Sequence, residues 1–415
     1  MDISSLMSRL DEASASLSVK NELSENQRVQ LHQACEKLSG CLATPGEHIM
    51  KTSSGCIEPA LIRVAIERGI LDLFNDDQNE FDEIEIATRT KTHPILTARL
   101  LRCLIMLRIV DVTPEGRCKS NSFTSSFKPG TPTHDYVLLF SGVYLPLFGR
   151  LPLYLQKTEY KVPDDINSGL LQDTFDTRLP FWDWMEAHKG EHDAFHRLME
   201  ATGSSNGDAW TKYIPEEWYS KHLSSVITGN GSFAFVDVGG SHGHEMKAFM
   251  QQFPAIKGRY ILQDLGGVSE KTRVQTGHGS LCEDVLRQSD GIEKMSHSFL
   301  DPQPVRGANI YLLSRILHDW PDREARKILG HLRDAMSKES TLFIWERVFP
   351  DRLSKVSPMD VLCDASMMAF FSAAERSESQ FRDLLESTGL SLVNVWRKES
   401  AGEDTQAVLE IVLGD

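Results

Sequence analysis

From about residue 232 onward, short apolar runs alternate with segments whose apolar residues recur at helical spacing. The runs predict buried strands and the segments between them predict amphipathic helices. The predicted strands are 235–238, 260–262, 310–313, 341–345, 392–395 and 407–413, and the predicted helices are 245–253, 323–336 and 379–388. This alternation predicts an α/β fold, a Rossmann-like doubly wound sheet that is largely parallel, with an antiparallel edge pair formed by the last two strands.

The first 130 residues show helical periodicity instead. Ser24-Glu-Asn-Gln27 is a capping-box pattern that predicts a helix start, and apolar residues follow it at helical spacing as far as Leu42. Further helices are predicted over 57–74, with a kink or stop at Gly69, over 82–90 and over 94–109. A strand, a turn and a strand follow over 110–120. Three helices and a hairpin have the outline of a winged helix.

Between about residues 135 and 225 the pattern is helical and rich in aromatic residues. Trp182 begins a segment that we predict to be helical as far as Met199 and beyond. Most of these rings are expected in a core, although a connector beside a cofactor domain is also a place to bind a flat organic molecule. We therefore predict an N-terminal helical and winged-helix-like domain at 1–130, a helical connector at 131–225 and an α/β domain at 226–415.

Composition and charge exclude several classes of function. The chain has 40% hydrophobic residues, 25% charged residues and a formal net charge of −15, which argues against nucleic acid and anionic membranes as partners. No apolar run approaches the length of a membrane span, and the N-terminus lacks the pattern of a signal peptide. Seven scattered cysteines without a Cys-x-x-Cys pair predict reduced thiols, a cytoplasmic location and no metal site.

The segment Phe235-Val-Asp-Val-Gly-Gly-Ser-His-Gly243 runs from a strand into a glycine turn. Gly239, Gly240 and Gly243 let the backbone turn sharply and let a ligand approach it closely. Asp237, just before the turn, can hold an ammonium group, and Asp264, at the end of the next strand, can accept hydrogen bonds from ribose hydroxyls. A carboxylate so near the turn disfavours a phosphate-bearing cofactor, so we predict S-adenosyl-L-methionine rather than NAD.

A candidate base follows a later strand, in Ile316-Leu-His-Asp-Trp-Pro-Asp322. Histidine is the side chain best suited to accept a hydroxyl proton near neutral pH, and His318 lies where catalytic groups gather in such sheets. A base histidine needs a carboxylate to orient it and to stabilise its charged form. Glu346, at the end of the strand 341–345, and Glu375 are the candidates for that role.

With these motifs, nearly the whole chain resembles the fungal class I S-adenosylmethionine-dependent O-methyltransferases of the caffeic-acid type. The resemblance implies O-methyl transfer to a hydroxyl of a small aromatic or polyketide-type secondary metabolite. His318 would be the base, flanked by Glu346 and Glu375. It also implies that the winged-helix-like domain forms a homodimer. The cofactor-binding residues implied, with the glycine turn, are Asp237, Gly239, Gly240, Gly243, Asp264, Leu265, Ser298, Phe299 and Arg315. The substrate-binding residues implied are Phe195, Met199, Trp320, Asp364 and Met367.

Several positions depart from the family pattern. Ser298 replaces an acid that often precedes Phe299, Ser314 replaces a frequent Lys or Arg, and Ser241 replaces a third glycine. The usual Gly-Gly-Lys-Glu-Arg-Thr loop has become Ser372-Ala-Ala-Glu-Arg-Ser377. These departures leave an alternative, which is a methyltransferase-fold enzyme of natural-product biosynthesis that catalyses a non-methylating, pericyclic or dehydrative reaction. A catalytically silent partner subunit is a third hypothesis.

Overall fold

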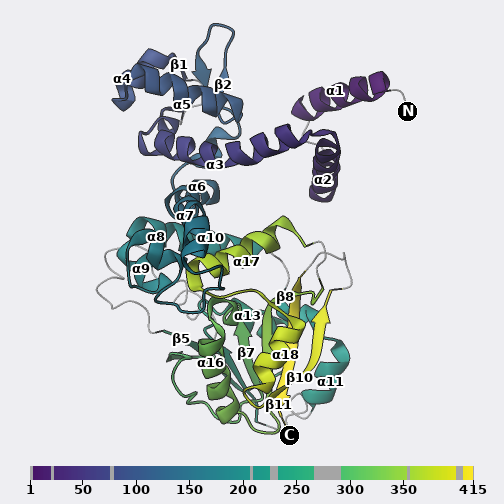
Figure 1. Cartoon of the computed structure of the whole chain (residues 1–415). Helices are drawn as coiled ribbons and strands as arrows, with labels where there is room; N and C mark the ends of the chain where they lie inside the picture. Colours follow the sequence, from purple (N-terminus) through teal and green to yellow (C-terminus); the bar gives the residue numbers. More distant parts are fainter. Residues whose placement is uncertain are drawn as a thin grey trace. The chain divides into compact units, whose positions relative to one another are not determined.

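The computed structural model describes residues 3–19, 23–74, 79–205, 209–224, 232–265, 291–352, 356–398 and 405–414. The chain forms two compact units, Met1–Lys128 and Pro129–Asp415, and each is described by itself (Figure 1). The predicted connector and the α/β region both belong to the second unit, and their separation into two domains remains a prediction.

The first unit begins with three helices, α1 (Ile3–Val19), α2 (Glu25–Leu42) and α3 (Pro45–Glu67). The capping box at Ser24 is confirmed, because its side chain accepts a hydrogen bond from the backbone of Gln27. The predicted start of a helix at residue 57 is wrong. A second capping box at Thr44, followed by a proline at the first helical position, starts α3 twelve residues earlier. Gly69 adopts a left-handed φ of 67° and ends the helical segment, as its position predicted.

The rest of the first unit follows the predicted pattern closely. Helices α4 (Glu83–Thr90) and α5 (Pro94–Met106) are followed by the hairpin strands β2 (Asp111–Val112) and β3 (Cys118–Lys119). Strand β1 (Glu80–Phe81) adds a third, antiparallel strand to this small sheet, and short 3-10 turns, η1 (Leu71–Phe74) and η2 (Thr124–Phe127), flank the module. Whether the module serves as a winged helix remains a prediction.

The second unit opens with a helical layer. It contains α6 (Pro132–Leu139), the π-helical turn η3 (Phe140–Tyr144), α7 (Leu145–Lys157), α8 (Leu170–Phe175), α9 (Phe181–Ala187) and α10 (Lys189–Ser205). The single helix predicted from Trp182 to beyond Met199 is wrong, because the chain breaks at His188. The ring of His188 stacks on Trp184 and its Nδ1 lies 2.7 Å from the carbonyl oxygen of that residue, which ends α9.

One helical stretch, Pro132–Lys157, is long and apolar enough to meet the criteria for a membrane span. No membrane span was predicted here from the sequence, because the stretch contains Pro146, Arg150 and Pro152. Length and composition alone are weak support for a span. Four of its residues, Leu139, Val143, Leu147 and Tyr154, are buried in an aromatic cluster with α17 (Pro358–Phe371).

The sheet of the second unit has the strand order β10-β11-β8-β7-β4-β5-β6. Its strands are β4 (Ala234–Val238), β5 (Arg259–Asp264), β6 (Ile292–Ser296), β7 (Ile310–Ser314), β8 (Thr341–Phe349), β10 (Leu390–Arg397) and β11 (Gln406–Leu413). Strands β6, β5, β4, β7 and β8 are parallel, and β11 is antiparallel to both β8 and β10. The predicted α/β fold is confirmed, and so is the antiparallel pair of the last two strands, β10 and β11, at one edge of the sheet.

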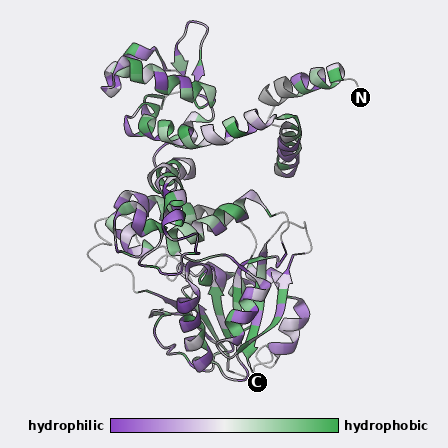
Figure 2. Cartoon of the chain, in the orientation of Figure 1, coloured by the Kyte–Doolittle hydropathy of each residue, from purple (hydrophilic) through white to green (hydrophobic). Residues whose placement is uncertain are grey.

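Apolar residues on alternate positions of each strand form two cores. Helices α16 (Asp322–Ala335) and α18 (Glu378–Glu386) cover one face. The other face packs against α13 (His244–Gln252), α11 (Glu216–His222) and the turn η4 (Trp210–Tyr213). Figure 2 shows the hydrophobic residues running along the strands between these layers. Strand β6 was not predicted, because Ile292-Glu-Lys-Met-Ser296 is a half-exposed edge strand with little apolar signal.

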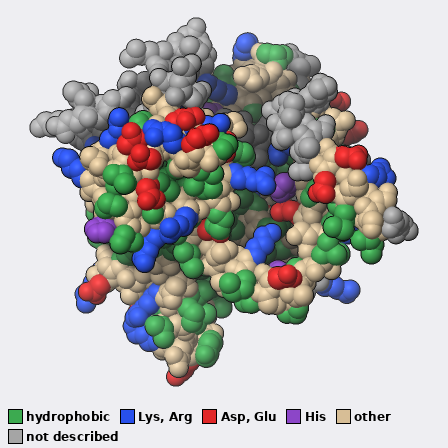
Figure 3. Space-filling model, turned by 90° about the horizontal axis from the view of Figure 1, so that it is seen from above, with side chains coloured by type: hydrophobic (Ala, Val, Ile, Leu, Met, Phe, Trp, Pro, Cys, Tyr) green, Lys and Arg blue, Asp and Glu red, His purple; other side chains and the backbone are tan. Residues whose placement is uncertain are grey.

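Charged side chains of both signs are distributed over the described surface. On the face shown in Figure 3, Lys and Arg lie scattered among acidic and apolar side chains rather than in one patch. A protein that binds nucleic acid along this face would need clustered cations. The view is consistent with the net charge of −15, and the predicted lack of a nucleic-acid partner remains a prediction.

Candidate active site

The carboxyl ends of four neighbouring strands bring the predicted site residues to one edge of the sheet. Strands β5, β4, β7 and β8 run parallel, with Asp237 paired to Leu262 on one side and to Leu312 on the other. The glycine turn follows β4, Asp264 ends β5, the His318 segment follows β7 and Glu346 lies near the end of β8. The crevice beyond such strand ends is where ligands bind in doubly wound sheets.

The glycine turn packs tightly against its neighbours. Gly239 has a φ of 71°, and a Cβ atom there would lie 2.8 Å from Cδ1 of Ile316. Gly239 and Gly240 both donate their backbone N–H to the carbonyl oxygen of Gln263, at 2.8 and 3.1 Å. Gly243, with a φ of 70°, then leads into α13. Because Ile316 is only two residues before His318, the glycine turn and the segment of the candidate base touch each other.

Asp237 is fully buried, and among the described residues its carboxylate oxygens complete no regular hydrogen bond, although the backbone of Met246 interacts with them. Burial, together with the nearby carboxyls of Glu245 and Asp264, raises the pKa of Asp237 to about 8. A buried carboxylate without partners is costly unless a ligand supplies a donor or a positive charge. Asp237 therefore fits the ammonium group of an amino-acid-bearing nucleoside such as S-adenosylmethionine.

Asp264 joins the turn to β5. Its carboxylate accepts hydrogen bonds of 2.7 Å from the backbone N–H groups of Ser241 and Leu265, and burial raises its pKa. Ser241 adopts a left-handed φ of 48°. A carboxylate can accept about four hydrogen bonds, so Asp264 retains capacity for ribose hydroxyls. Leu265 is 68% exposed at the end of this strand.

The remaining predicted cofactor residues lie on the segments that flank the turn. The ring of Phe299 packs edge-on against Trp320 at 5.6 Å, and one of its carbons would lie 3.3 Å from a Cβ at Gly239. The hydroxyl of Ser298 accepts a hydrogen bond from the backbone of Leu300. Arg315 pairs with Glu245 at 3.5 Å, and its guanidinium lies over the ring of Trp345. Phe299 and Trp320 thus contact each other beside the turn.

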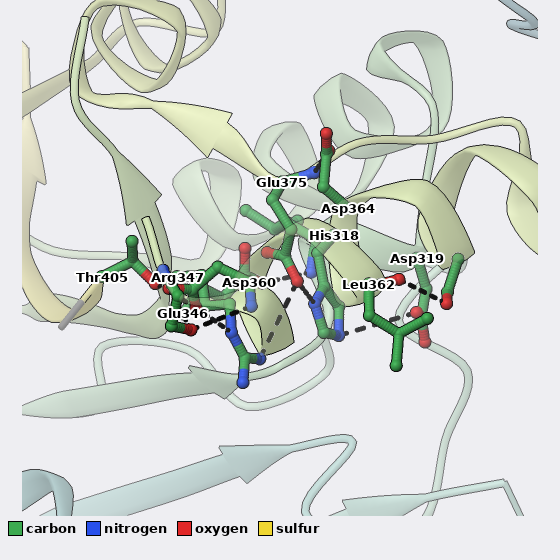
Figure 4. Close-up of polar contacts among 12 residues, drawn as sticks. His318, Asp319, Glu346, Arg347, Asp360, Leu362, Asp364, Glu375 and Thr405 are labelled. Carbon is green, nitrogen blue, oxygen red and sulfur yellow. Dashed lines mark hydrogen bonds and ion pairs between the residues drawn. The ribbon is translucent and has the colours of Figure 1, made fainter. Parts of the chain in front are cut away.

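His318 lies in the 3-10 turn η5 (Leu317–Asp319) and is held from both sides of its ring. Its Nδ1 lies 3.0 Å from Oε1 of Glu375, and its Nε2 lies 3.6 Å from Oδ1 of Asp319 (Figure 4). Burial alone lowers the pKa of His318, but the carboxylates of Asp319, Glu375 and Glu346 outweigh burial and raise it to about 9. Burial also raises the pKa of Asp319, to about 7.

The side chain of Glu346 binds the backbone of the segment that carries His318. Its Oε1 accepts hydrogen bonds from the backbone N–H groups of Ile316 and Leu317, at 3.0 and 2.5 Å. Its Oε2 is buried without a hydrogen-bond partner, and burial raises the pKa of this carboxyl. The charge of Glu346 also raises the pKa of His318. Its predicted place beside the imidazole remains a prediction, and the structure adds that it anchors the backbone of the same segment.

Glu375 is the carboxylate that orients the imidazole, and other residues fix Glu375 in turn. Its backbone N–H donates to Oδ1 of Asp364 at 3.0 Å, and Arg347 Nη1 lies 4.0 Å from its Oε1. Arg347 also binds Asp360 at 3.0 Å. Figure 4 shows this chain of contacts from Asp360 through Arg347 and Glu375 to His318. Asp364 holds the backbone of Glu375, and its predicted place in the acceptor pocket remains a prediction.

Two other predicted substrate-binding residues, Phe195 and Met367, lie in the aromatic cluster of the helical layer. Phe195 meets Phe181 at 5.6 Å and Trp182 at 5.7 Å, with its ring edge-on to both. Met367, on the same helix α17 as Asp364, packs against this cluster. Met199 is 45% exposed. The structure thus places Phe195 and Met367 in one cluster, and Trp320 packs beside Phe299.

Sequence reasoning missed three residues around His318, namely Asp319, Arg347 and Arg376. Asp319 and Arg376 lie inside motifs already singled out, so adjacency to His318 and Glu375 was an available signal. Arg376 is 5% exposed and binds the backbone on both sides of His318. Arg347, which directly follows Glu346 on β8, carried no comparable signal because its contact with Glu375 depends on the tertiary fold.

Comparison with known proteins agrees with this geometry. Residues 224–391 match the model of an O-methyltransferase domain. The chain is 30% identical to the O-methyltransferase gsfD of Penicillium aethiopicum, over 90% of this chain and 88% of that protein. Two solved structures have a similar fold. One is a pericyclic reaction enzyme, with 24% sequence identity and a TM-score of 0.77, and the match covers 98% of this chain and 100% of that chain. The other is the LepI complex with SAM, with 23% sequence identity and a TM-score of 0.76, and the match covers 99% of this chain and 100% of that chain. The chain therefore belongs to the S-adenosylmethionine-dependent O-methyltransferases, the family that contains this fungal enzyme.

Proposed function

We propose that this chain transfers a methyl group from S-adenosylmethionine to a hydroxyl of a small aromatic or polyketide-type secondary metabolite, with His318 as the general base. The observation that carries the proposal is the 3.0 Å contact between His318 Nδ1 and Glu375, on a segment that touches the glycine turn through Ile316. A contact of this kind fixes the tautomer and leaves Nε2 to accept a proton.

Different residues bind the cofactor, accept the proton and contact the acceptor. Asp237, Asp264 and the glycine turn would hold S-adenosylmethionine, which would supply an electrophilic methyl group and leave as the neutral thioether. Nε2 of His318 accepts the hydroxyl proton, and Glu375 stabilises the imidazolium that results. The aromatic cluster around Phe195 and Met367 provides apolar faces against which a flat acceptor can pack.

The raised pKa of His318 makes this activity dependent on pH. With a pKa of about 9, most of the imidazole is protonated at neutral pH and unable to accept a second proton. At pH values below 9, the active, neutral fraction therefore grows about tenfold for each unit by which the pH rises. A positive charge brought close to the ring lowers this pKa, so binding of a cationic cofactor favours the active form.

Labelled methyl transfer tests the proposal. The protein is incubated with S-adenosylmethionine that carries a labelled methyl group and with a panel of phenolic polyketides, and mass spectrometry locates the label. We expect the label on oxygen, and we expect His318→Ala to reduce the rate by on the order of 10²–10⁴ while the affinity for S-adenosylhomocysteine is retained. Failure to label any acceptor would count against methyl transfer.

One observation favours the non-methylating alternative. An imidazole with a pKa of about 9 is a proton donor at neutral pH, which suits the loss of water from a substrate alcohol. In such a dehydration His318 would protonate the departing hydroxyl and a carboxylate would accept the proton from carbon. Consumption of a substrate with loss of 18 mass units, with no label transferred, would identify this alternative.

We further propose a homodimer formed through the first unit, in a cytoplasmic protein. Helices α2 and α3 expose large apolar side chains that nothing in the described part of the chain covers, namely Leu31, Leu42, Ile49, Met50 and Ile57. Exposed apolar patches of this kind are typical of protein interfaces. Light scattering would show twice the chain mass, and Ile49→Lys combined with Ile57→Lys would shift the protein to monomer. A monomeric wild type would contradict the proposal.

A further inference from the structure

The turn that carries His318 is weakly held by its own hydrogen bonds. Within η5 the backbone N–H of Asp319 donates to Ile316 and that of Trp320 donates to Leu317, both at 3.2 Å. A 3-10 turn of three residues has poor hydrogen-bond geometry and little rigidity of its own. The orientation of the imidazole therefore depends on groups from outside the turn.

Arg376 supplies such groups. Its Nη1 donates to the carbonyl oxygen of Leu317 and its Nη2 donates to that of Trp320, both at 2.7 Å. These carbonyls lie on either side of His318. The guanidinium also binds Oδ1 of Asp322 at 3.0 Å, and the residue is only 5% exposed. Two donors in a rigid planar fork fix two acceptors relative to each other, which a lysine ammonium cannot do.

Two carboxylates, one of them next to Arg376 in the sequence, hold the His318 segment together with Arg376. Glu375, the preceding residue, binds the imidazole ring, while Glu346 accepts the N–H groups of Ile316 and Leu317. Strand β9 (Arg376–Ser377) pairs with β8 so that Arg376 lies opposite Val348, two residues beyond Glu346. The same pair of strands thus provides the acceptor for the N–H groups of the turn and the donor for its carbonyl groups.

We propose that Arg376 is a positioning residue that locks the backbone of the His318 turn through its two carbonyl contacts, independently of its ion pair with Asp322. The inference rests on the proposed role of His318 as the base. It differs from an electrostatic role, in which any cation at this position would serve. It also differs from a purely structural role, in which Asp322 would be the important partner.

Arg326 provides a matched control. It binds the other oxygen of Asp322, at 3.1 Å, and it also contacts Ser387 rather than the His318 turn. Arg326 is largely exposed, whereas Arg376 is buried. The variants Arg376→Lys and Arg326→Lys make the same chemical change on two arginines that share one carboxylate.

Two measurements test the proposal in the full-length protein with S-adenosylhomocysteine bound. In Arg376→Lys we expect backbone amide exchange in the segment 317–320 to rise at least tenfold. We also expect kcat to fall about 10- to 100-fold, with the affinity for S-adenosylhomocysteine unchanged, as for a displaced catalytic group. Arg326→Lys and Asp322→Asn should leave both quantities near the wild-type values.

Each outcome of these measurements supports or overturns the proposed role of Arg376. Wild-type exchange and kcat in Arg376→Lys would overturn the proposal, and so would an Asp322→Asn variant that reproduces the loss. If Arg376→Lys does not fold, Arg376→Gln replaces it, and Asp322→Asn still discriminates between the carbonyl contacts and the ion pair. If the wild type transfers no methyl group, the proposed function fails, whereas the exchange measurement, which needs no acceptor, still decides the role of Arg376.

Discussion

Glu375 contacts His318 with its side chain at 3.0 Å, while its backbone N–H is bound by Asp364 at the same distance. The residue that orients the base is therefore itself fixed from helix α17, the helix that carries Met367 of the aromatic cluster. An acceptor that presses on α17 can in this way influence the position of the imidazole.

Removal of the Glu375 charge should change both the rate and its pH dependence. Glu375 raises the pKa of His318, so Glu375→Gln should lower that pKa and move the rising limb of the kcat profile to lower pH. The maximal rate should fall by about 10- to 1,000-fold, because the imidazolium loses its stabilising partner. Glu378→Gln, on the surface of α18, is the control and should leave the profile unchanged. A rising limb of the kcat profile at the same pH in Glu375→Gln as in the wild type would disprove this account.

The glycine turn should not tolerate a side chain at Gly239. A Cβ atom there would lie 2.8 Å from Ile316 and the residue would keep its left-handed φ, so Gly239→Ala should destabilise the fold by about 1–3 kcal/mol. It should also weaken binding of S-adenosylhomocysteine, measured by calorimetry. Gly330→Ala, in the interior of α16 where a Cβ meets nothing within 4 Å, should instead stabilise the fold by about 0.5–1 kcal/mol. Equal effects of the two substitutions on thermal unfolding would refute the prediction.

The fold should tolerate an amide in place of the Glu346 carboxylate but not the loss of this side chain. Glu346→Gln retains an oxygen that can accept the two backbone N–H groups, so the fold should be nearly as stable as the wild type. Glu346→Ala leaves both donors buried without an acceptor and should cost about 2–4 kcal/mol. Chemical denaturation measures both values. A fully stable Glu346→Ala variant would show that the anchor has no effect.

Asp237 should make the ligand-free protein less stable as the pH rises. The pKa of this carboxyl is raised in the folded state, to about 8, so the folded protein binds the proton more tightly than the unfolded chain. Its contribution is favourable at low pH and is lost progressively between about pH 4 and pH 8. His318, whose pKa is raised to about 9, adds stability below about pH 6.5 that disappears as the pH rises through 9.

Thermal unfolding of the ligand-free protein at pH 6 and pH 9 measures this effect. The melting temperature of the wild type should be lower at pH 9, and Asp237→Asn should reduce the difference between the two values. The same variant should bind S-adenosylhomocysteine more weakly, because the ammonium group loses its counter-ion. An unchanged pH dependence in Asp237→Asn would mean that other groups control the stability.

Local chemistry explains which features could be predicted from the sequence. Gly239, Asp237 and Asp264 were identifiable because a strand, a sharp turn and a second strand follow one another within about thirty residues. His318 was identifiable because it follows a buried strand. The base–carboxylate pair of His318 and Glu375 spans 57 residues, so the sequence offered Glu375 only as one of two candidates, beside Glu346.

The remaining features depend on tertiary contacts. The break at His188 is accompanied by a ring stacked on Trp184, and Gly190, two residues later, is a local signal that the prediction did not use. The partners of Glu346 are backbone N–H groups that become its neighbours only when β7 and β8 pair. Helix α17 went unrecognised because its residues are apolar around most of the helix, so no polar stripe marks its periodicity.

The strand order has a consequence for how such an enzyme can diversify. Strands β4 and β5 present the proposed cofactor-binding residues, whereas β7, β8 and β9 present the proposed base and the residues that support it. Each half is built from adjacent backbone, and the two meet at Ile316 against Gly239. Mutations beyond β8 can therefore retune or redirect the chemistry while the cofactor-binding half stays intact, which gives evolution a modular route from one reaction to another on a single scaffold.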